Sequence, residues 1–327
     1  MIIARSPLRI TLGGGGTDLA SYYEQREGFL LAAAIDKYVY VSVMRPFRPG
    51  IYLKYSSLEH VEQVADVRHP IIRVALRLQD MPSPQIEITT LADIPAGTGL
   101  GSSGSFTTAL LKALYAHQRK AVQSHELAEL ACHIEIERLG EPIGKQDQFV
   151  AAYGGISGFT FHTDHRVSVQ PLRISPGTLY ELEDNLLLFF TGFNRAAGTI
   201  LRDEQQRSQA GDADMLSNLD HVKQLGLRSR DALERGDLTR FGELLNEQWE
   251  YKKRRSPGTS NAQIDAWYSL ALGNGAVGGK LVGAGGGGFL LFYADDRDAL
   301  RRAMTREGLR EVRFAFDHEG SKLLARD

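Results

Sequence analysis

The stretch that most constrains this chain is "PAGTGLGSSGS", Pro95–Ser105, because its closely spaced glycines join a strand pattern to a helix pattern. The preceding "QIEITT" alternates as a strand does, and the following "SFTTALLKALYAH" has the apolar spacing of a helix. Glycines let consecutive backbone N–H groups converge on one anion, and the helix dipole adds positive potential there. The stretch predicts a phosphate-binding loop, with a flexible connection as the alternative.

This loop lacks the lysine of the Walker pattern G-x-x-x-x-G-K-[ST], so cationic charge for a phosphate must come from elsewhere in the chain. Its serines can coordinate a metal or donate to phosphate oxygens. The residues predicted to bind phosphate are Pro95, Gly97, Thr98, Gly99, Leu100, Gly101, Ser102, Ser103, Gly104 and Ser105.

Composition narrows the class of protein. A length of 327 residues favours two domains, and 43% hydrophobic with 24% charged residues is ordinary for a globular protein. A formal net charge of −2 argues against a nucleic-acid partner. The single cysteine, Cys132, excludes an intramolecular disulfide. The longest apolar run is too short for a membrane span and no signal peptide is recognisable, so we expect a cytoplasmic protein.

The pattern of elements changes near Asp184. Before it, strands and helices mix, and "FLLAAAI" is expected to pair with "YVYVSVM" through a turn at Asp36-Lys37. After it, helices dominate from Arg195 to about Leu272, followed by two strands, a helix from Arg297 and a last strand, "EVRFAFD". We therefore predict a mixed domain over residues 1–184 and an α+β domain over residues 185–327.

Acidic residues cluster around "GEPIGKQDQ". Asp147 follows the helix pattern of "SHELAELACHIEIERLG", for which Ser124 is the expected N-cap and Gly140 the residue past the end. At about 100° per residue, Glu135 falls within the apolar arc of that helix and Glu137 at its edge. A buried carboxylate needs a partner, either a bound cation or an ordinary salt bridge.

Two further glycine clusters are candidates for binding. "PLRITLGGGGTD" places Gly15, Gly16, Thr17 and Asp18 at the end of a strand, where an acid and a hydroxyl beside open backbone suit a polyhydroxy ligand. The alternative is that Thr17 or Asp18 caps a helix. In "KLVGAGGGGFLLFY", the glycines around 285–286 exceed what a hairpin turn needs, which favours close approach to a ligand or to the other domain.

These four stretches, in this order, resemble the GHMP kinase superfamily. "PAGTGLGSSGS" is similar to its P-x-x-x-G-L-[GS]-S-[SA] motif, and "GEPIGKQDQ" to G-x-P-C-G-I-M-D-Q. The resemblance covers about residues 5–293. It implies an α+β, two-domain fold, with an N-terminal ribosomal-protein-S5-like domain and a C-terminal ferredoxin-like domain. It also implies a kinase that uses ATP and magnesium (Mg²⁺).

The resemblance also implies roles for individual residues. Asp147 matches the catalytic base, and Arg9 the arginine that pairs with it. Ser103 and Glu135 match the Mg²⁺ ligands, since Glu135, unlike Glu137, keeps the family's spacing to Gly140 and to Asp147. The sugar contacts implied or favoured are Gly15, Gly16, Thr17, Asp18, Asp147, Gly285 and Gly286.

Within the superfamily, "IGKQDQFVAAYGG" and "TGFNR" are most similar to the D-glycero-D-manno-heptose 7-phosphate kinases, which phosphorylate the anomeric hydroxyl. A substrate with a 7-phosphate needs a cationic partner, for which Arg195, Lys252, Lys253 and Lys280 are the candidates. The alternatives are a kinase for fucose, galactose, mannose or an N-acetylhexosamine, or a non-catalytic ligand sensor. The expected partners are a sugar phosphate and ATP. A homodimer is one alternative for the oligomeric state, which the sequence leaves open.

Overall fold

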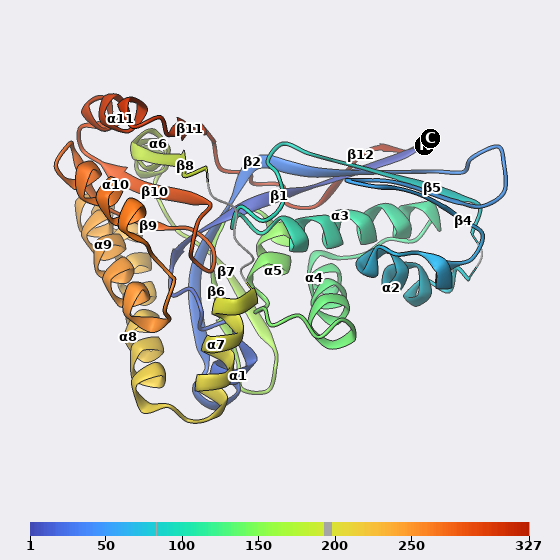
Figure 1. The fold of residues 1–327 in the computed structure, drawn as a ribbon, viewed down its shortest axis with the longest axis horizontal. Helices are drawn as coiled ribbons and strands as arrows, with labels where there is room; N and C mark the ends of the chain where they lie inside the picture. Colours follow the sequence, from blue (N-terminus) through green and yellow to red (C-terminus); the bar gives the residue numbers. More distant parts are fainter. Residues whose placement is uncertain (83, 193–197, 327) are drawn as a thin grey trace.

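The computed structural model describes residues 1–82, 84–192 and 198–326. This part of the chain forms two sheets. The large sheet has helices beneath it, and the small sheet lies with two long helices at one end of the molecule (Figure 1). The large sheet has the order β12-β1-β2-β5-β3-β4, and β6 and β7 continue from β2. Its strands are β1 (Ile2–Gly13), β2 (Gly28–Met44), β3 (Ile51–Lys54), β4 (Leu58–Val61), β5 (Ile86–Ala92), β6 (Ile156–Phe161), β7 (Val167–Pro171) and β12 (Lys322–Arg326).

The expected turn at Asp36-Lys37 is wrong, because both apolar runs belong to the single strand β2. The register with the partner strand β1 shifts at this point: Pro7 pairs with Tyr38 and Leu8 with Ile35, so Asp36 and Lys37 have no partner residues in β1. Side chains of β2 then enter the core on both faces of the sheet, which explains the uninterrupted apolar run.

The small sheet has the order β11-β8-β10-β9 and is antiparallel throughout. Its strands are β8 (Leu186–Phe190), β9 (Ala276–Leu281), β10 (Phe289–Ala294) and β11 (Arg310–Glu311). The predicted strand "EVRFAFD" is mostly wrong: beyond Glu311, its apolar side chains pack into the core with a single bridge, Ile35 to Phe316. The chain instead ends in β12, which pairs with β1, so its two ends lie together (Figure 1).

Helices cover both sheets. Those of the first half are α1 (Ala20–Arg26), η1 (Val64–Asp66), α2 (Pro70–Leu78), α3 (Ser102–His117), α4 (Ser124–Cys132), the π-helix η2 (His133–Arg138) and α5 (Gln146–Tyr153). Those of the second half are α6 (Pro176–Asn185), α7 (Gly198–Gln209), α8 (Ala213–Glu234), α9 (Leu238–Arg255), α10 (Ala262–Leu272) and α11 (Arg297–Arg306). In the described segments, no helix is long and apolar enough to cross a bilayer.

The hydrophobic core has one cluster on each face of the large sheet. One cluster joins β2 to α2, α3, α4 and α5. The other joins the opposite faces of β1 and β2 to α8, α9 and the small sheet. The C-terminal strand β12 returns to the large sheet, which is formed otherwise by the first half of the chain. The domain boundary between residues 184 and 185 stays a prediction.

Candidate active site

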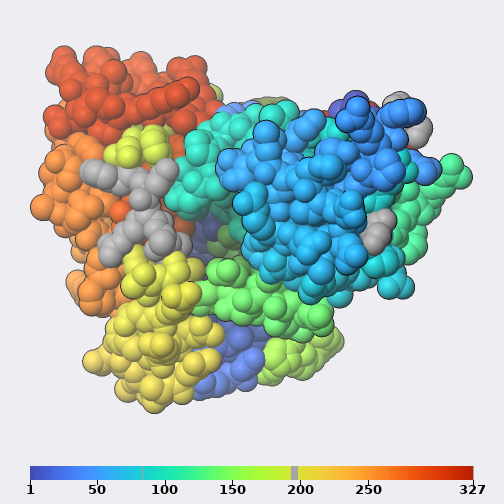
Figure 2. All heavy atoms as spheres, turned by 45° about the vertical axis from the view of Figure 1, so that its right-hand side comes forward, coloured from blue at the N-terminus to red at the C-terminus, as the bar shows by residue number. Residues whose placement is uncertain are grey.

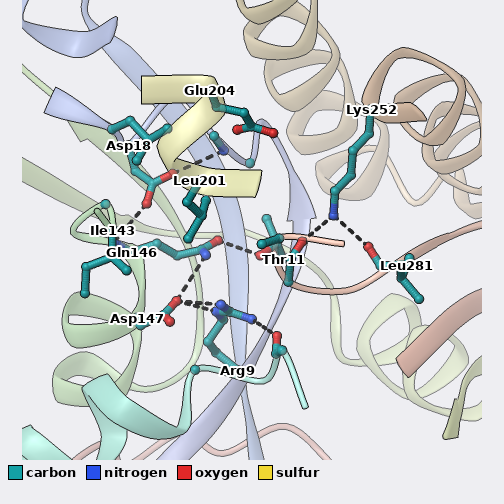
Figure 3. Close-up of a pocket in the computed structure, with 18 of the residues that line it drawn as sticks. Arg9, Thr11, Asp18, Ile143, Gln146, Asp147, Leu201, Glu204, Lys252 and Leu281 are labelled. Carbon is teal, nitrogen blue, oxygen red and sulfur yellow. Dashed lines mark hydrogen bonds and ion pairs between the residues drawn. The ribbon is translucent and has the colours of Figure 1, made fainter. Parts of the chain in front are cut away.

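A cavity of about 320 Å³ lies where the two halves of the chain meet, in a region that Figure 2 shows to be hollowed. It receives the ends of β1, α3 and α5 from the first half, and parts of α7, α9 and β9 from the second. Figure 3 shows how the side chains converge on it. All four glycine-rich or acidic stretches of the sequence contribute to its lining.

The loop before α3 faces this cavity with only part of its length. Gly97, Gly99, Gly101, Ser102 and Ser103 line the cavity, and the three glycines have φ near +80°. Such a backbone favours glycine. The loop therefore offers bare backbone and the beginning of α3 to a ligand.

The other predicted phosphate-binding residues do not line the cavity. Thr98 is buried and its hydroxyl donates to Pro95 O at 3.0 Å, while Ser105 donates to Pro7 O at 2.6 Å. Pro95 is exposed and Leu100 lies in the core. Gly104 packs against Asp147, where a Cβ would come within 2.8 Å of the aspartate Cβ. These residues fix the shape of the loop.

Asp147 and Arg9 form an ion pair inside the cavity. Arg9 Nε donates to Asp147 Oδ1 at 2.7 Å, and Arg9 Nη2 lies 2.6 Å from the same oxygen. Arg9 Nη1 donates to Gly99 O at 2.6 Å, so the arginine also holds the glycine loop. Arg9 is 4% exposed, and Asp147 lies in the first turn of α5 with its carboxylate open to the cavity (Figure 3).

Glu135 and Glu137 differ as the helical arc predicts. Glu135 is 1% exposed, and its carboxylate accepts hydrogen bonds from Ser103 Oγ and, at 3.0 Å, from Gln148 Nε2. Burial raises the pKa of Glu135 in spite of these bonds. Glu137 is exposed and pairs with His133 at 2.7 Å. Ser103 and Glu135 are thus brought together beside the cavity.

The loop after β1 contributes Gly15, Gly16 and Asp18 to the cavity. Asp18 accepts hydrogen bonds from the backbone N–H groups of Gly16 at 3.2 Å and Gln146 at 3.3 Å, and does not cap α1. Burial, and then repulsion from Asp147, raise the pKa of Asp18. This acid therefore joins the two predicted binding stretches.

Thr17, predicted as a sugar contact, is fully buried and does not line the cavity. Its hydroxyl donates to the backbone oxygens of Gly14 at 2.9 Å and Phe29 at 2.8 Å, so it stabilises the loop without facing the cavity. The structure therefore corrects this residue from a ligand contact to a support of Gly15, Gly16 and Asp18.

The third glycine cluster needs a similar correction. Gly283 and Ala284 line the cavity, whereas Gly285 and Gly286 pack against Thr259, with Gly286 N donating to Thr259 O at 2.9 Å. A Cβ on Gly283 would lie 2.6 Å from the Cα of Gly99. The cluster is both a hairpin between β9 and β10 and a close approach to the first half, as the alternatives allowed.

Several lining residues were not predicted. Thr11 donates to Gln146 at 2.5 Å, and Arg255 pairs with Glu204 at 3.3 Å, with both charged side chains 3% exposed. Arg255 and Glu204 lie on α9 and α7, about fifty residues apart, so no spacing in the sequence could have paired them.

The structure places three of the four basic residues predicted as partners of a sugar phosphate. Lys252 and Lys280 line the cavity, whereas Lys253 does not. Arg195 lies outside the described residues.

The chain is similar in sequence to known proteins. Residues 69–155 match the model of the GHMP kinases N terminal domain, and residues 229–310 that of the GHMP kinases C terminal region. The chain is 32% identical to D-glycero-alpha-D-manno-heptose 7-phosphate kinase from Campylobacter jejuni, with 98% of each chain covered. The chain belongs to the GHMP kinase family. The predicted fold, the family and the similarity to heptose 7-phosphate kinases are thereby confirmed.

Two other relatives of this GHMP kinase are informative. A crystal structure of a D-glycero-D-manno-heptose 1-phosphate kinase from Bacteroides thetaiotaomicron superposes with a TM-score of 0.82 at 26% identity, with 100% of each chain covered. A bifunctional fucokinase/GDP-fucose pyrophosphorylase from Arabidopsis thaliana is 28% identical over 92% of this chain and 30% of that protein. The chain is therefore a phosphotransferase, a sugar kinase of a family that uses ATP as phosphate donor.

Proposed function

We propose that this GHMP kinase phosphorylates the anomeric (C1) hydroxyl of D-glycero-D-manno-heptose 7-phosphate and so forms the 1,7-bisphosphate. The observation that carries the proposal is the pairing of Arg9 with Asp147 in a cavity that also receives the glycine loop. The similarity to a heptose 7-phosphate kinase along nearly the whole chain supports the choice of sugar.

In the proposed reaction, the C1 hydroxyl oxygen attacks the γ-phosphorus of ATP, the bond to the β-phosphate oxygen breaks, and ADP leaves. Asp147 orients the hydroxyl and accepts its proton as general base. Arg9 stabilises negative charge on the transferred phosphoryl group, as does the bare backbone of Gly97, Gly99 and Gly101. Arg9 thus supplies the cationic charge that the loop itself lacks.

Glu135 and Ser103 fit a Mg²⁺ ion. Both residues offer oxygen ligands, and the Glu135 carboxylate is buried and accepts hydrogen bonds from the neutral side chains of Ser103 and Gln148. Such a carboxylate gains from a nearby cation. No cluster of three or more His, Cys, Asp or Glu side chains suited to a metal occurs in the described ranges, which agrees with an ion held largely by ATP phosphates. When bound, Mg²⁺ neutralises charge on those phosphates.

The sugar is proposed to lie against Asp18, Gly15 and Gly16, opposite the glycine loop. Asp18 can accept hydrogen bonds from sugar hydroxyls, and the absence of side chains at Gly15 and Gly16 leaves room for a seven-carbon sugar. Thr17 supports this loop without touching the sugar. The product would serve the synthesis of nucleotide-activated heptose for bacterial surface polysaccharide, and we propose the cytoplasm as the compartment.

The second candidate is a kinase for an unphosphorylated sugar, which the similarity to a fucokinase favours. Purified protein with ATP and Mg²⁺ is offered heptose 7-phosphate, fucose, galactose, mannose and N-acetylhexosamines, and the products are identified by ³¹P NMR. We expect a new anomeric phosphate signal and the highest kcat/KM with heptose 7-phosphate. A higher kcat/KM with an unphosphorylated sugar would reject heptose 7-phosphate as the substrate.

A further inference from the structure

Lys280 of β9 is a buried basic side chain with unused hydrogen-bonding capacity. It is 6% exposed and lines the cavity, and among the described residues its amine makes one hydrogen bond, to Gln248 Oε1 at 3.4 Å. Within the described segments no carboxylate comes within 4.0 Å of this nitrogen, yet an ammonium has three N–H donors. Such a group is costly to bury unless something anionic meets it.

Other cations surround this amine. Lys252 of α9 donates to Leu281 O at 3.0 Å and to Gly283 O, and Arg255 lies one turn further along the helix. Burial, then repulsion from Lys252 and Arg255, hold the pKa of Lys280 well below its usual range. Burial and Arg255 lower the pKa of Lys252 to about 7. Glu204 pairs with Arg255 at 3.3 Å and acts on Lys252 only at longer range, so three basic side chains share this one carboxylate.

Lys252 lies away from the reacting end of the cavity. In Figure 3, Lys252 stands on one side of the cavity, with Asp147 and Asp18 on the other. Lys280 lines the same cavity, and its amine contacts Gln248, which lies one turn before Lys252 on α9. One molecule bound in the cavity can therefore present a hydroxyl to Asp147 while an anionic group at its other end meets the lysines.

We propose that Lys280, assisted by Lys252, binds the non-reacting phosphate of the sugar, so that the cavity selects a sugar already phosphorylated at the end remote from C1. This inference rests on the proposed function and assigns its specificity to named residues. The phosphate supplies the counter-charge that the chain itself does not, and it anchors the sugar with C1 toward Asp147.

The test compares Lys280→Met with Lys253→Met. Lys253 is a matched control, because it follows Lys252 directly but pairs with Glu250 at 2.8 Å outside the cavity. For each protein, kcat and KM are measured with heptose 7-phosphate, with the unphosphorylated heptose and with ATP. We expect Lys280→Met to lower kcat/KM for the phosphorylated sugar about 10- to 100-fold, mainly through KM, which is the range for one charged hydrogen bond.

In the same variant, kcat/KM for unphosphorylated heptose and KM for ATP should change less than about threefold, and Lys253→Met should resemble the wild type. Thermal unfolding of Lys280→Met establishes that it folds, and Lys280→Gln serves as a second variant. A raised KM for ATP, or equal losses on both sugars, would assign the amine to ATP or to structure and overturn the proposal.

The wild-type protein separates failure of this inference from failure of the proposed function. If it prefers unphosphorylated sugars, the proposed function fails, and the phosphate site falls with it. If it prefers heptose 7-phosphate and Lys280→Met keeps that preference undiminished, the proposed function stands and the phosphate site at Lys280 is wrong.

Discussion

Asp147 owes its expected chemistry to its position, since Arg9 holds one carboxylate oxygen and the cavity leaves the group accessible. Asp147→Asn keeps an oxygen for Arg9 but removes the base. We expect kcat to fall about 10²- to 10⁴-fold, the usual contribution of a general base, while the Kd of ATP changes less than about fivefold. Steady-state kinetics and nucleotide titration measure both. Asp164→Asn, on an exposed aspartate, is the control, and turnover of Asp147→Asn within a few-fold of wild type would exclude Asp147 as the base.

Glu135 and Glu137 make a matched pair two residues apart. Glu135→Gln keeps the shape of a buried side chain but removes its charge, so we expect the Mg²⁺ concentration for half-maximal activity to rise at least about tenfold. Glu137→Gln, on the exposed side, should shift it less than about twofold. Thermal unfolding without Mg²⁺ should show Glu135→Gln at least as stable as wild type, because a buried charge is gone. The reverse order of Mg²⁺ requirements would contradict the assignment.

Lys280 gives the stability of the protein a dependence on pH. Because its pKa is lowered in the folded state, unfolding takes up a proton between that lowered value and the usual pKa of about 10.4, so its destabilising effect fades as pH rises. In phosphate-free buffer, we expect Lys280→Met to exceed wild type in free energy of unfolding at pH 7, and the gap to narrow toward pH 10. Denaturant titrations across that range measure the gap, and a gap that widens would contradict this account.

At the scale of elements, the loop before α5 is pressed against the loop after β1. A Cβ on Gly144 would lie 2.0 Å from Asp18 Oδ2 and 2.7 Å from Asp18 O, so backbone must move. We expect Gly144→Ala to cost about 1–3 kcal/mol and to lower kcat/KM, because Asp18 and the start of α5 shift together. Gly177→Ala in α6 meets only Ser175 Oγ at 3.8 Å and should stabilise by about 0.5–1 kcal/mol. Thermal unfolding and kinetics of both variants test this, and an unimpaired Gly144→Ala would contradict it.

Patterns confined to one segment were enough to predict most elements. The strand–loop–helix around Pro95–Ser105 and the burial of Glu135 follow from local periodicity, and both are found in the structure. The continuity of β2 was missed because an apolar run with two polar residues inside reads as a hairpin until the register of β1 is known. The pairing of β12 with β1 and of Arg255 with Glu204 depends on tertiary contacts that no local pattern encodes.

At the scale of the whole molecule, the cavity depends on contact between the two halves. Gly283 meets Gly99, and Gly288 approaches Thr98 O so closely that a Cβ would lie 2.2 Å from it. The core cluster around Leu31 and Phe241 also combines the two sheets. Shared core and close backbone contact keep Lys280 and Asp147 facing one cavity, so binding and catalysis both require the halves to stay together.

This shared core predicts that the two halves unfold together, although two-domain proteins often unfold in steps. The chain carries a reporter for each half. Cys132 is buried beneath the large sheet, and Trp249 and Trp267 belong to a further hydrophobic cluster, which the small sheet forms with α9, α10 and α11. In a guanidinium titration, labelling of the Cys132 thiol and tryptophan fluorescence should give coincident midpoints. The control is Leu110→Ala, a substitution in the core beneath the large sheet alone, which should lower both midpoints equally. Separate midpoints, or a shift in the Cys132 curve alone, would show that the halves are independent and that the cavity forms only when they dock.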